Sequence, residues 1–336
     1  MKKLNNKFSK EIIRWYRTSG RNNLPWRKNI SPYRVWISEI MLQQTQVKTV
    51  IPYFKRFIKR YPNLKQISLA SEEEILALWT GLGFYRRAKN IFKTKEVIKN
   101  DYKNKFPSSF NEIIALPGIG RSTAGAIMSI AYRNSYPILD ANVKRVISRY
   151  RNINLHDKSA IKKLWLLSES FSPKKNIFEY TQGIMDLGAT ICKTRSPSCK
   201  ECPLSNSCKS AFQNFEFISK KKKKKSKRKI HFTLAHSKSN FLLFKRNKKT
   251  FWESLWLPCD NQNLKASNIF QDPCKCEVRN FNHALSHIDL DITIQIFDYE
   301  SPFKIKTNLE HQWVSKDQID KFGMPKPIKT IIENYG

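Results

Sequence analysis

Residues 116–132 read LPGIGRSTAGAIMSIAY, where two glycines stand directly before a stretch with helical character. Gly118 and Gly120 permit a tight turn whose backbone amides can approach a phosphate, and the N-terminus of the following helix adds positive potential. A G-x-G pair is a weak signal by itself, because an ordinary turn between two helices has the same composition. The stretch predicts two helices joined by a turn, with phosphate contact as the functional interpretation.

A carboxylate, Glu39, stands among apolar residues in WISEIMLQQTQV (36–47). Ser31 and Pro32 suit the N-cap and first position of a helix, and apolar residues then recur at helical spacing. A carboxylate near such a buried face loses hydration, which raises its pKa. A lone Glu more often lies on the polar side of an amphipathic helix, so a catalytic interpretation depends on the rest of the chain.

A second carboxylate, Asp140, stands in PILDANVKRVISRY (137–150), before a predicted helix with Lys144, Arg145 and Arg149. Asp is a favoured N-cap residue. This structural role is compatible with a catalytic one.

Composition limits the class of protein. The hydrophobic content of 40% in 336 residues excludes wholesale disorder, and the net charge of +35 indicates a polyanionic partner. Nucleic acid is the first candidate, although charge alone supports DNA, RNA or an anionic membrane surface almost equally. The sequence has no apolar run of membrane-spanning length and no signal-peptide core near its start. We expect a protein without membrane association in the cytoplasm, associated with the nucleoid if the source is bacterial.

Four of the seven cysteines form one group, CKTRSPSCKECPLSNSC (192–208), with the spacing C-x6-C-x2-C-x5-C. The odd total argues for metal ligation over a disulfide framework. Structural zinc sites usually pair two short hooks, whereas only one C-x2-C occurs here. The spacing therefore favours a [4Fe–4S] cluster held by Cys192, Cys199, Cys202 and Cys208, with zinc as the alternative.

The chain changes character near residue 219. Residues 8–218 are predicted to be mostly helical, with capping boxes at Ser71/Glu74 and Ser109/Glu112. The stretch SKKKKKKSKRK (219–229) has no apolar residue and is predicted to be a solvated linker, with DNA contact as a secondary interpretation.

The C-terminal part has strand patterns. LDITIQIF (290–297) alternates apolar and polar residues, and HFTLAHS (231–237) and NFLLFKR (240–246) are further strand candidates. A terminal helix is predicted to begin near Pro327. The region is predicted to be a small α+β domain.

These motifs, in this order, resemble the helix-hairpin-helix DNA glycosylase superfamily and, within it, the adenine DNA glycosylase (MutY) family. The resemblance covers residues 8–212 and rests on LPWR (24–27), SEIMLQQTQV (38–47), LWTGLG (78–83), LPGIGRSTAGAI (116–127), LDANVKRV (139–146), MDLGA (185–189) and the four cysteines. The tail resembles the Nudix-like domain of the family more loosely. It has no Glu-rich Nudix box, so we expect no pyrophosphohydrolase activity.

The resemblance implies two domains. Residues 1–218 are expected to form a mostly α helix-hairpin-helix glycosylase domain with an iron–sulfur subdomain at 192–208. After the Lys-rich linker at 219–229, residues 230–336 are expected to form a smaller α+β Nudix-like domain for mispair recognition.

The resemblance also implies an activity. It is the hydrolysis of the N-glycosidic bond of adenine mispaired with 8-oxoguanine or guanine in double-stranded DNA, for base excision repair. Glu39 matches the acid/base residue that protonates adenine, and Asp140 matches the carboxylate that stabilises the cationic sugar. Ser122 stands where lyase-competent relatives such as endonuclease III have lysine, so a monofunctional enzyme is expected, because a Schiff base needs that amine. One [4Fe–4S] cluster and a monomer are expected.

Further side chains match family positions. Trp26 and Arg27 match the pocket entrance, Gln44 a residue wedged near the mispair, Gln182 a reader of the adenine Hoogsteen edge, Asn142 a neighbour of the reacting sugar, and Gly118 and Gly120 the contacts to the DNA backbone.

Some positions depart from the family. Phe84 replaces the tyrosine inserted beside 8-oxoguanine, and Ala141 replaces a glycine. In HALSH (283–287), Leu285 replaces the phenylalanine of a Phe-Ser-His recognition loop, whereas Ser286 and His287 are retained.

Two other functions compete with this one. An endonuclease III-like glycosylase/lyase for oxidised pyrimidines is disfavoured by Ser122 and by the additional tail. A non-enzymatic DNA-binding protein is disfavoured by the presence of both carboxylates in well-matched surroundings.

Overall fold

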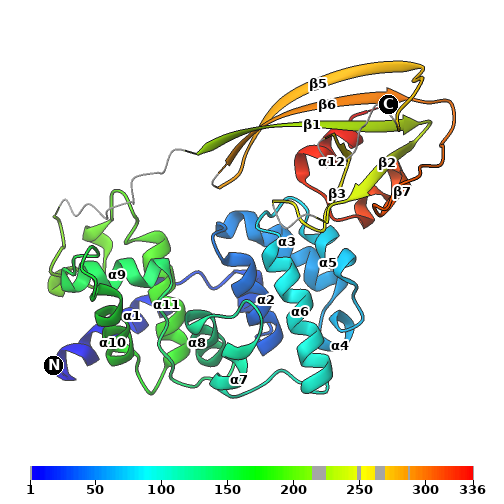
Figure 1. Ribbon diagram of the computed structural model, residues 1–336. Coiled ribbons are helices and arrows are strands. Elements are labelled where there is room, and N and C mark those ends of the chain that lie inside the picture. The colour runs from blue at the N-terminus through cyan, green and yellow to red at the C-terminus, as the bar shows by residue number, and fades with distance from the viewer. Residues whose placement is uncertain (1, 214–224, 248–250, 262–268, 287, 336) are drawn as a thin grey trace. The chain divides into compact units, whose positions relative to one another are not determined.

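The computed structural model describes residues 2–213, 225–247, 251–261, 269–286 and 288–335 (Figure 1). The chain forms two compact units. The first comprises Met1–Leu69 and Lys93–Lys220, and the second comprises Ala70–Phe92 and Lys221–Gly336.

The first unit is helical. Its elements are α1 (Lys2–Ser19), η1 (Pro25–Arg27), α2 (Pro32–Leu42), α3 (Val47–Arg60), α4 (Leu64–Ile67), most of α6 (Arg86–Asp101), α7 (Phe110–Ala115), α8 (Arg121–Ile130), α9 (Ala141–Arg151), α10 (Ala160–Phe171), α11 (Ile177–Thr190), η2 (Cys199–Glu201) and η3 (Ser205–Ser207). The predicted caps are confirmed. Ser31 accepts a hydrogen bond from the Arg34 amide, and Ser109 and Glu112 form a capping box.

Close packing in the first unit brings α9 against α11 and α8 against the segment before α9. A Cβ atom at Gly188 of α11 would lie 2.6 Å from the Asn142 Cβ atom of α9. A Cβ atom at Gly125 of α8 would lie 2.3 Å from the Pro137 carbonyl oxygen. Only glycine allows these approaches, and both fix the start of α9, where Asp140 lies.

The second unit contains a mixed sheet. Its strands are β1 (Ser226–Ser237), β2 (Asn240–Lys245), β3 (Trp256–Leu257), β4 (Cys259–Asp260), β5 (Lys275–Ala284), β6 (Ile288–Asp298) and β7 (His311–Ser315). The order is β3-β2-β1-β6-β5, with β4 beside β1 and β7 beside β2; β1 and β6 are parallel, and the other pairs are antiparallel. The remaining elements are α5 (Glu72–Trp79), η5 (Lys316–Lys321) and α12 (Lys326–Glu333).

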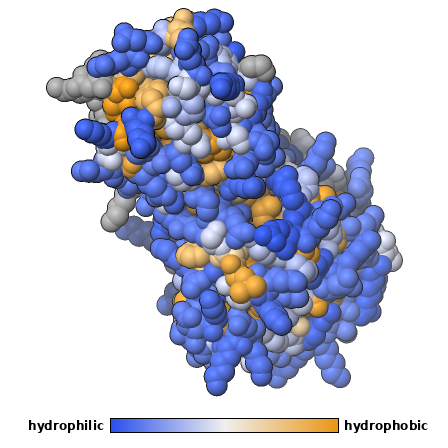
Figure 2. Space-filling model, turned by 90° about the vertical axis from the view of Figure 1, so that its right-hand side faces the viewer, coloured by the Kyte–Doolittle hydropathy of each residue, from blue (hydrophilic) through white to orange (hydrophobic). Residues whose placement is uncertain are grey.

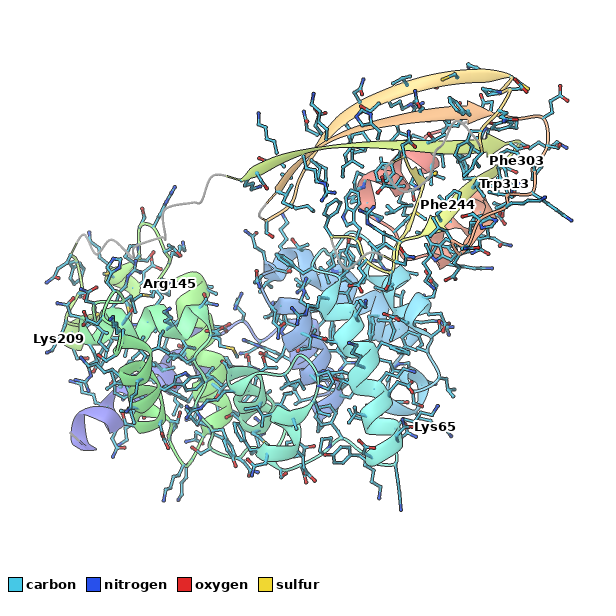
Figure 3. The ribbon with its side chains drawn as sticks, viewed as in Figure 1. Lys65, Arg145, Lys209, Phe244, Phe303 and Trp313 are labelled. Atoms are coloured by element: carbon cyan, nitrogen blue, oxygen red, sulfur yellow. The ribbon has the colours of Figure 1, made fainter. Side chains whose placement is uncertain are left out.

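The second unit has an aromatic cluster of its own. Phe244 belongs to a buried group that Phe303 and Trp313 partly cover (Figure 3). The Trp313 indole donates a hydrogen bond to the Phe303 carbonyl oxygen at 3.0 Å, so its one polar atom is satisfied.

The predicted strands at 231–237, 240–246 and 290–297 are confirmed by β1, β2 and β6, and the terminal helix begins one residue before Pro327. The predicted end of the linker at 229 is wrong, because residues 226–229 belong to β1. They pair with residues 288–291 of β6, and Lys225 forms an ion pair with Asp289. Backbone pairing with a distant strand outweighs the repulsion among these basic side chains. Residues 219–224 of the predicted linker lie outside the described residues.

Residues 70–92 pack with the C-terminal residues. The Gly323 amide donates to Glu73 at 3.1 Å, the Met324 amide donates to Thr80 at 3.3 Å, and the Tyr85 hydroxyl donates to the Met324 carbonyl oxygen at 2.9 Å. The predicted domain limits assign residues 70–92 to the helical domain at 1–218, whereas in the structure they belong to the second unit. Packing therefore divides the chain differently from the sequence pattern at this segment.

Hydrophilic residues cover most of the face shown in Figure 2, with hydrophobic residues in small groups. None of the helices in the described part of the chain is both long and apolar enough to cross a membrane.

Candidate active site

Glu39 lies on α2 between the buried residues Ser38 and Ile40, and its own side chain is partly exposed. Burial raises the pKa of the Glu39 carboxyl to about 8; the nearby Asp140 carboxylate also raises it, and Arg27 lowers it. A carboxyl group with this pKa holds its proton at neutral pH. Desolvation among apolar neighbours, as predicted, is the largest cause.

Asp140 is the N-cap of α9, as predicted, and accepts a hydrogen bond from the Val143 amide at 2.7 Å. Burial raises the pKa of Asp140, whereas hydrogen bonds from the Val143 and Asn142 amides and the charge of Arg145 lower it. These donors stabilise the ionised form. The pKa of Asp140 is raised overall, with burial as the largest cause, but unlike Glu39 this carboxyl has backbone amide donors that favour its charged form. The two environments therefore differ in the way that acid catalysis with cation stabilisation requires.

Ser122 of α8 holds the chain just before Asp140. Its hydroxyl accepts a hydrogen bond from the Leu139 amide at 3.0 Å. Nearby, the side-chain amide of Gln43, just after α2, donates a hydrogen bond to the Thr123 hydroxyl at 3.5 Å. These contacts link α2, α8 and α9 around the two carboxylates.

The two glycines of the predicted turn have different roles. Gly118 has φ +79°, a conformation that L side chains rarely adopt. Gly120 is the N-cap of α8 at φ −93°, and a Cβ atom there would meet nothing within 4 Å. Gly118 is thus required by the turn, whereas Gly120 leaves open space at a helix N-terminus, where an anion is stabilised.

Trp26 and Arg27 are the last two residues of η1. Trp26 is buried, with its ring 5.5 Å from that of Phe54. The Arg27 side chain is 4% exposed and forms an ion pair with Asp186 at 2.7 Å. Because its charge lowers the pKa of Glu39, Arg27 belongs to the site.

Three further predicted residues lie in the first unit. Asn142 accepts a hydrogen bond from Arg145 at 2.8 Å, next to Asp140. Gln182 is buried on α11, and Gln44 is exposed just after α2 with φ +57°. The structure thus brings Asn142 to Asp140 and gives Gln44 the exposure that a DNA-facing residue needs.

The predicted lesion-reading residues belong to the second unit. Phe84 is 42% exposed with φ +51°, and Arg87 lies over its ring at 5.3 Å from the centroid. Leu285 closes the β5–β6 hairpin by donating its amide proton to Ile288 at 2.8 Å, and Ser286 is exposed. His287 lies outside the described residues.

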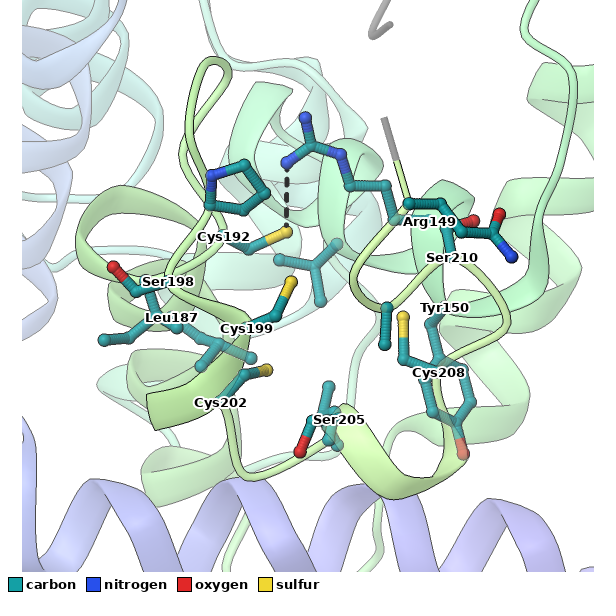
Figure 4. Close-up of a pocket in the computed structure, with 16 residues that line it drawn as sticks. Arg149, Tyr150, Leu187, Cys192, Ser198, Cys199, Cys202, Ser205, Cys208 and Ser210 are labelled. Carbon is teal, nitrogen blue, oxygen red and sulfur yellow. Dashed lines mark hydrogen bonds between the residues drawn. The ribbon is translucent and has the colours of Figure 1, made fainter. Parts of the chain in front are cut away.

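The four grouped cysteines line one cavity with Arg149, Tyr150 and Leu187 (Figure 4). Arg149 donates to the Cys192 sulfur at 3.4 Å, and Arg145 donates to the Cys192 carbonyl oxygen at 2.7 Å. Two arginines of α9 therefore connect the cysteine loop with the helix that begins at Asp140.

The donor set of this cavity is four cysteine thiols, a ligand type shared by structural zinc sites and iron–sulfur clusters. Among the described residues, no three or more potential ligands are placed to hold a single metal ion. A zinc ion needs its sulfur ligands within about 2.3 Å of one point, whereas the corners of an iron–sulfur cube are further apart. Burial, together with a smaller effect of the other three cysteines, raises the pKa of the Cys202 thiol to about 12, so thiolates here require a positively charged group.

Sequence reasoning missed two residues of the site, Arg21 and Asp186. The Asp186 carboxylate is fully buried and pairs with both Arg21 and Arg27. The available signal was the same as for Glu39, an acidic residue in an apolar helix (GIMDLGA, 183–189).

Comparisons with known proteins identify the family of this chain. Residues 37–169 match the HhH-GPD superfamily of base excision DNA repair proteins, and residues 231–334 match the NUDIX domain. The match to the superfamily includes residues 70–92, which pack with the second unit. The chain is 41% identical to the adenine DNA glycosylase of Buchnera aphidicola subsp. Schizaphis graminum over 98% of both chains. It is 35% identical to that of Homo sapiens over 60% of this chain and 39% of the relative.

Solved structures show the same helical fold. A thermostable thymine-DNA glycosylase superposes with TM-score 0.56 and 31% identity, covering 62% of this chain and 97% of the other. Endonuclease III in a non-covalent complex with DNA superposes with TM-score 0.54 and 23% identity, covering 63% and 96%. The 41% identity to the Buchnera aphidicola enzyme extends over 98% of both chains. The chain therefore belongs to the adenine DNA glycosylases of the HhH-GPD superfamily.

Proposed function

We propose that this glycosylase hydrolyses the N-glycosidic bond of adenine mispaired with 8-oxoguanine or guanine in double-stranded DNA. The observation that carries the proposal is the pair of unlike carboxylates, Glu39 with its pKa near 8 and Asp140 capped by backbone amides. Both side chains are partly exposed, so a base turned out of the helix can reach them.

The two carboxylates divide the reaction between them. Glu39 donates its proton to the adenine, and the electron pair of the N-glycosidic bond leaves with the base. The sugar that remains has cationic character, which the charged Asp140 stabilises. Water then adds to the sugar, and its proton returns to the Glu39 carboxylate.

The reaction is proposed to end at an abasic site. A lyase step needs an amine that forms a Schiff base with the sugar. Ser122 occupies the matching position and accepts a hydrogen bond from the Leu139 amide, so it contributes to structure.

Base selection is assigned to residues around this pair. Trp26, Arg27 and Gln182 are proposed to line the adenine pocket, and Gln44 is proposed to contact the opened mispair. Asn142 is proposed to lie beside the sugar, and Gly118 and Gly120 beside the DNA backbone. The open space at Gly120 and the net charge of +35 support the DNA contact.

A panel of duplexes tests the substrate. Release of adenine opposite 8-oxoguanine and guanine, with little release opposite thymine, is expected. Release of oxidised pyrimidines would indicate the endonuclease III-like alternative, and binding without any base release would indicate a non-enzymatic protein.

We further propose that the chain acts as a monomer in the cytoplasm.

The cysteine cavity is proposed to hold one [4Fe–4S] cluster through Cys192, Cys199, Cys202 and Cys208. Its fit rests on the shared cavity and on thiols that require a positive partner. The cluster would order the loop between Cys192 and Cys199, in which Lys193 and Arg195 are exposed and are proposed to meet phosphates.

Protein purified without oxygen is expected to be brown, with about four irons per chain. Cys276→Ala, at an exposed cysteine outside the cavity, should keep this iron content, whereas Cys199→Ala should lose it. Colourless protein with stoichiometric zinc and full activity would contradict the assignment.

Lesion reading is proposed to involve Phe84, Leu285 and Ser286. Leu285 supplies an apolar contact without aromatic stacking, which is worth about 1–3 kcal/mol per base. Leu285→Phe should therefore raise the preference for 8-oxoguanine over guanine by roughly fivefold or more. The measurement is the ratio of single-turnover excision rates on the two mispairs.

The matched control for this change is Val278→Phe, at an exposed position of β5, the strand that leads into the hairpin turn, which should leave the ratio unchanged. If Leu285→Phe also leaves the ratio unchanged, the hairpin does not read the lesion.

A further inference from the structure

Asp186 lies on α11 and its side chain is completely buried. Arg27 donates to it with Nη1 at 2.7 Å and Nη2 at 2.9 Å. Arg21 donates with Nε at 2.8 Å, Nη2 at 2.5 Å and its backbone amide at 2.9 Å. One carboxylate therefore orients two guanidinium groups. Arg27 reaches both carboxylate oxygens, in the bidentate geometry that restricts such a pair most strongly, whereas both side-chain nitrogens of Arg21 donate to Oδ1.

This arrangement exceeds what a structural ion pair requires. One arginine would balance the buried carboxylate. The second, Arg21, keeps 29% of its side chain exposed, so Arg27 is the cation that is enclosed together with Asp186. The Arg27 side chain, 4% exposed, also donates to the Arg21 carbonyl oxygen at 3.0 Å. A buried guanidinium such as that of Arg27 is costly to desolvate unless negative or polar acceptors surround it.

The positive charge of Arg27 acts on the carboxyl group of Glu39. Besides burial, the charged groups that act on Glu39 are Asp140 from α9, which raises its pKa, and Arg27 from η1, which lowers it. The side chain of Arg27 would have many rotamers without its partner on α11.

We propose that Asp186 is a positioning residue of the glycosylase reaction, which fixes the Arg27 guanidinium beside Glu39 and acts on catalysis through it. The proposal rests on the function proposed above, because it takes Glu39 as the proton donor. Loss of the Asp186 carboxylate releases Arg27, since an amide has one acceptor oxygen and an NH₂ group that repels guanidinium donors. The pKa of Glu39 then rises further, and the protonated form persists to higher pH.

The test is the pH profile of single-turnover adenine excision from duplexes with adenine opposite 8-oxoguanine. Wild-type activity should fall as the pH rises through about 8, where Glu39 loses its proton. Arg27→Met and Asp186→Asn should each move this fall upward by about one pH unit, the lower part of the range for a neighbouring opposite charge. The double variant should match Arg27→Met alone, because both changes act through one group.

Glu179→Gln is the matched control. Glu179 lies on the same helix and pairs at 3.6 Å with Arg17, which is largely exposed, so its removal should leave the profile unchanged. A purely structural Asp186 would change the melting temperature without moving the profile.

The proposal is overturned if Arg27→Met keeps the wild-type profile, or if Asp186→Asn shifts the profile equally with and without Arg27. If Asp186→Asn does not fold, Arg27→Lys replaces it. Lysine keeps the charge but cannot span both carboxylate oxygens, so its profile should lie between those of wild type and Arg27→Met. A wild-type profile without any fall near pH 8 would instead count against Glu39 as the acid, and so against the proposed function.

Discussion

Glu39→Gln should bind mispaired duplex as wild type does and release adenine about 10²–10⁴-fold more slowly, the usual contribution of a positioned general acid. Glutamine has nearly the same shape but no proton to donate. The raised pKa of Glu39 shows why the wild-type residue has one at neutral pH. Single-turnover excision rates and duplex affinity, measured together, separate the chemical step from binding.

The control for this variant is Glu112→Gln. Glu112 is an exposed capping-box residue of α7, and glutamine serves the same position, so excision should be unchanged. Excision by Glu39→Gln at the wild-type rate would remove Glu39 from the mechanism.

Asp140→Asn should reduce excision about 10²–10³-fold, the scale observed when one preorganised group that stabilises a developing charge is removed. Asparagine is as good an N-cap as aspartate, so α9 and the melting temperature should be preserved. The variant therefore separates the two roles of Asp140, the cap observed in the fold and the charge proposed for catalysis.

Asp140→Ala completes this comparison. It removes the cap as well as the charge, and should cost about 1 kcal/mol of stability in addition to activity. If Asp140→Asn retains wild-type excision, Asp140 is a structural residue only.

Local signals in the sequence predicted the parts of the site that local chemistry determines. The helix at Ser31–Pro32, the N-cap at Asp140 and the desolvation of Glu39 each follow from a few neighbouring residues. The spacing of the four cysteines predicted side chains that share one cavity. In each case the residues that decide the outcome lie close together in the chain.

The missed features depend on partners far away in the sequence. Asp186 meets Arg21 across 165 residues, and no local pattern shows which charges a buried carboxylate will find. Residues 226–229 become strand because β6 offers a parallel partner more than fifty residues later. The packing of Thr80 and Tyr85 against Met324 likewise joins segments that the sequence pattern assigns to different domains.

The central claim is that this chain removes adenine by acid-assisted hydrolysis and leaves the sugar–phosphate backbone intact. Product analysis of one duplex with adenine opposite 8-oxoguanine tests it most directly. The result predicted by Glu39, Asp140 and Ser122 is free adenine, an abasic strand that breaks only after alkali, and no covalent adduct after borohydride treatment. Absence of free adenine, or strand cleavage without alkali together with a borohydride-trapped adduct, would contradict it.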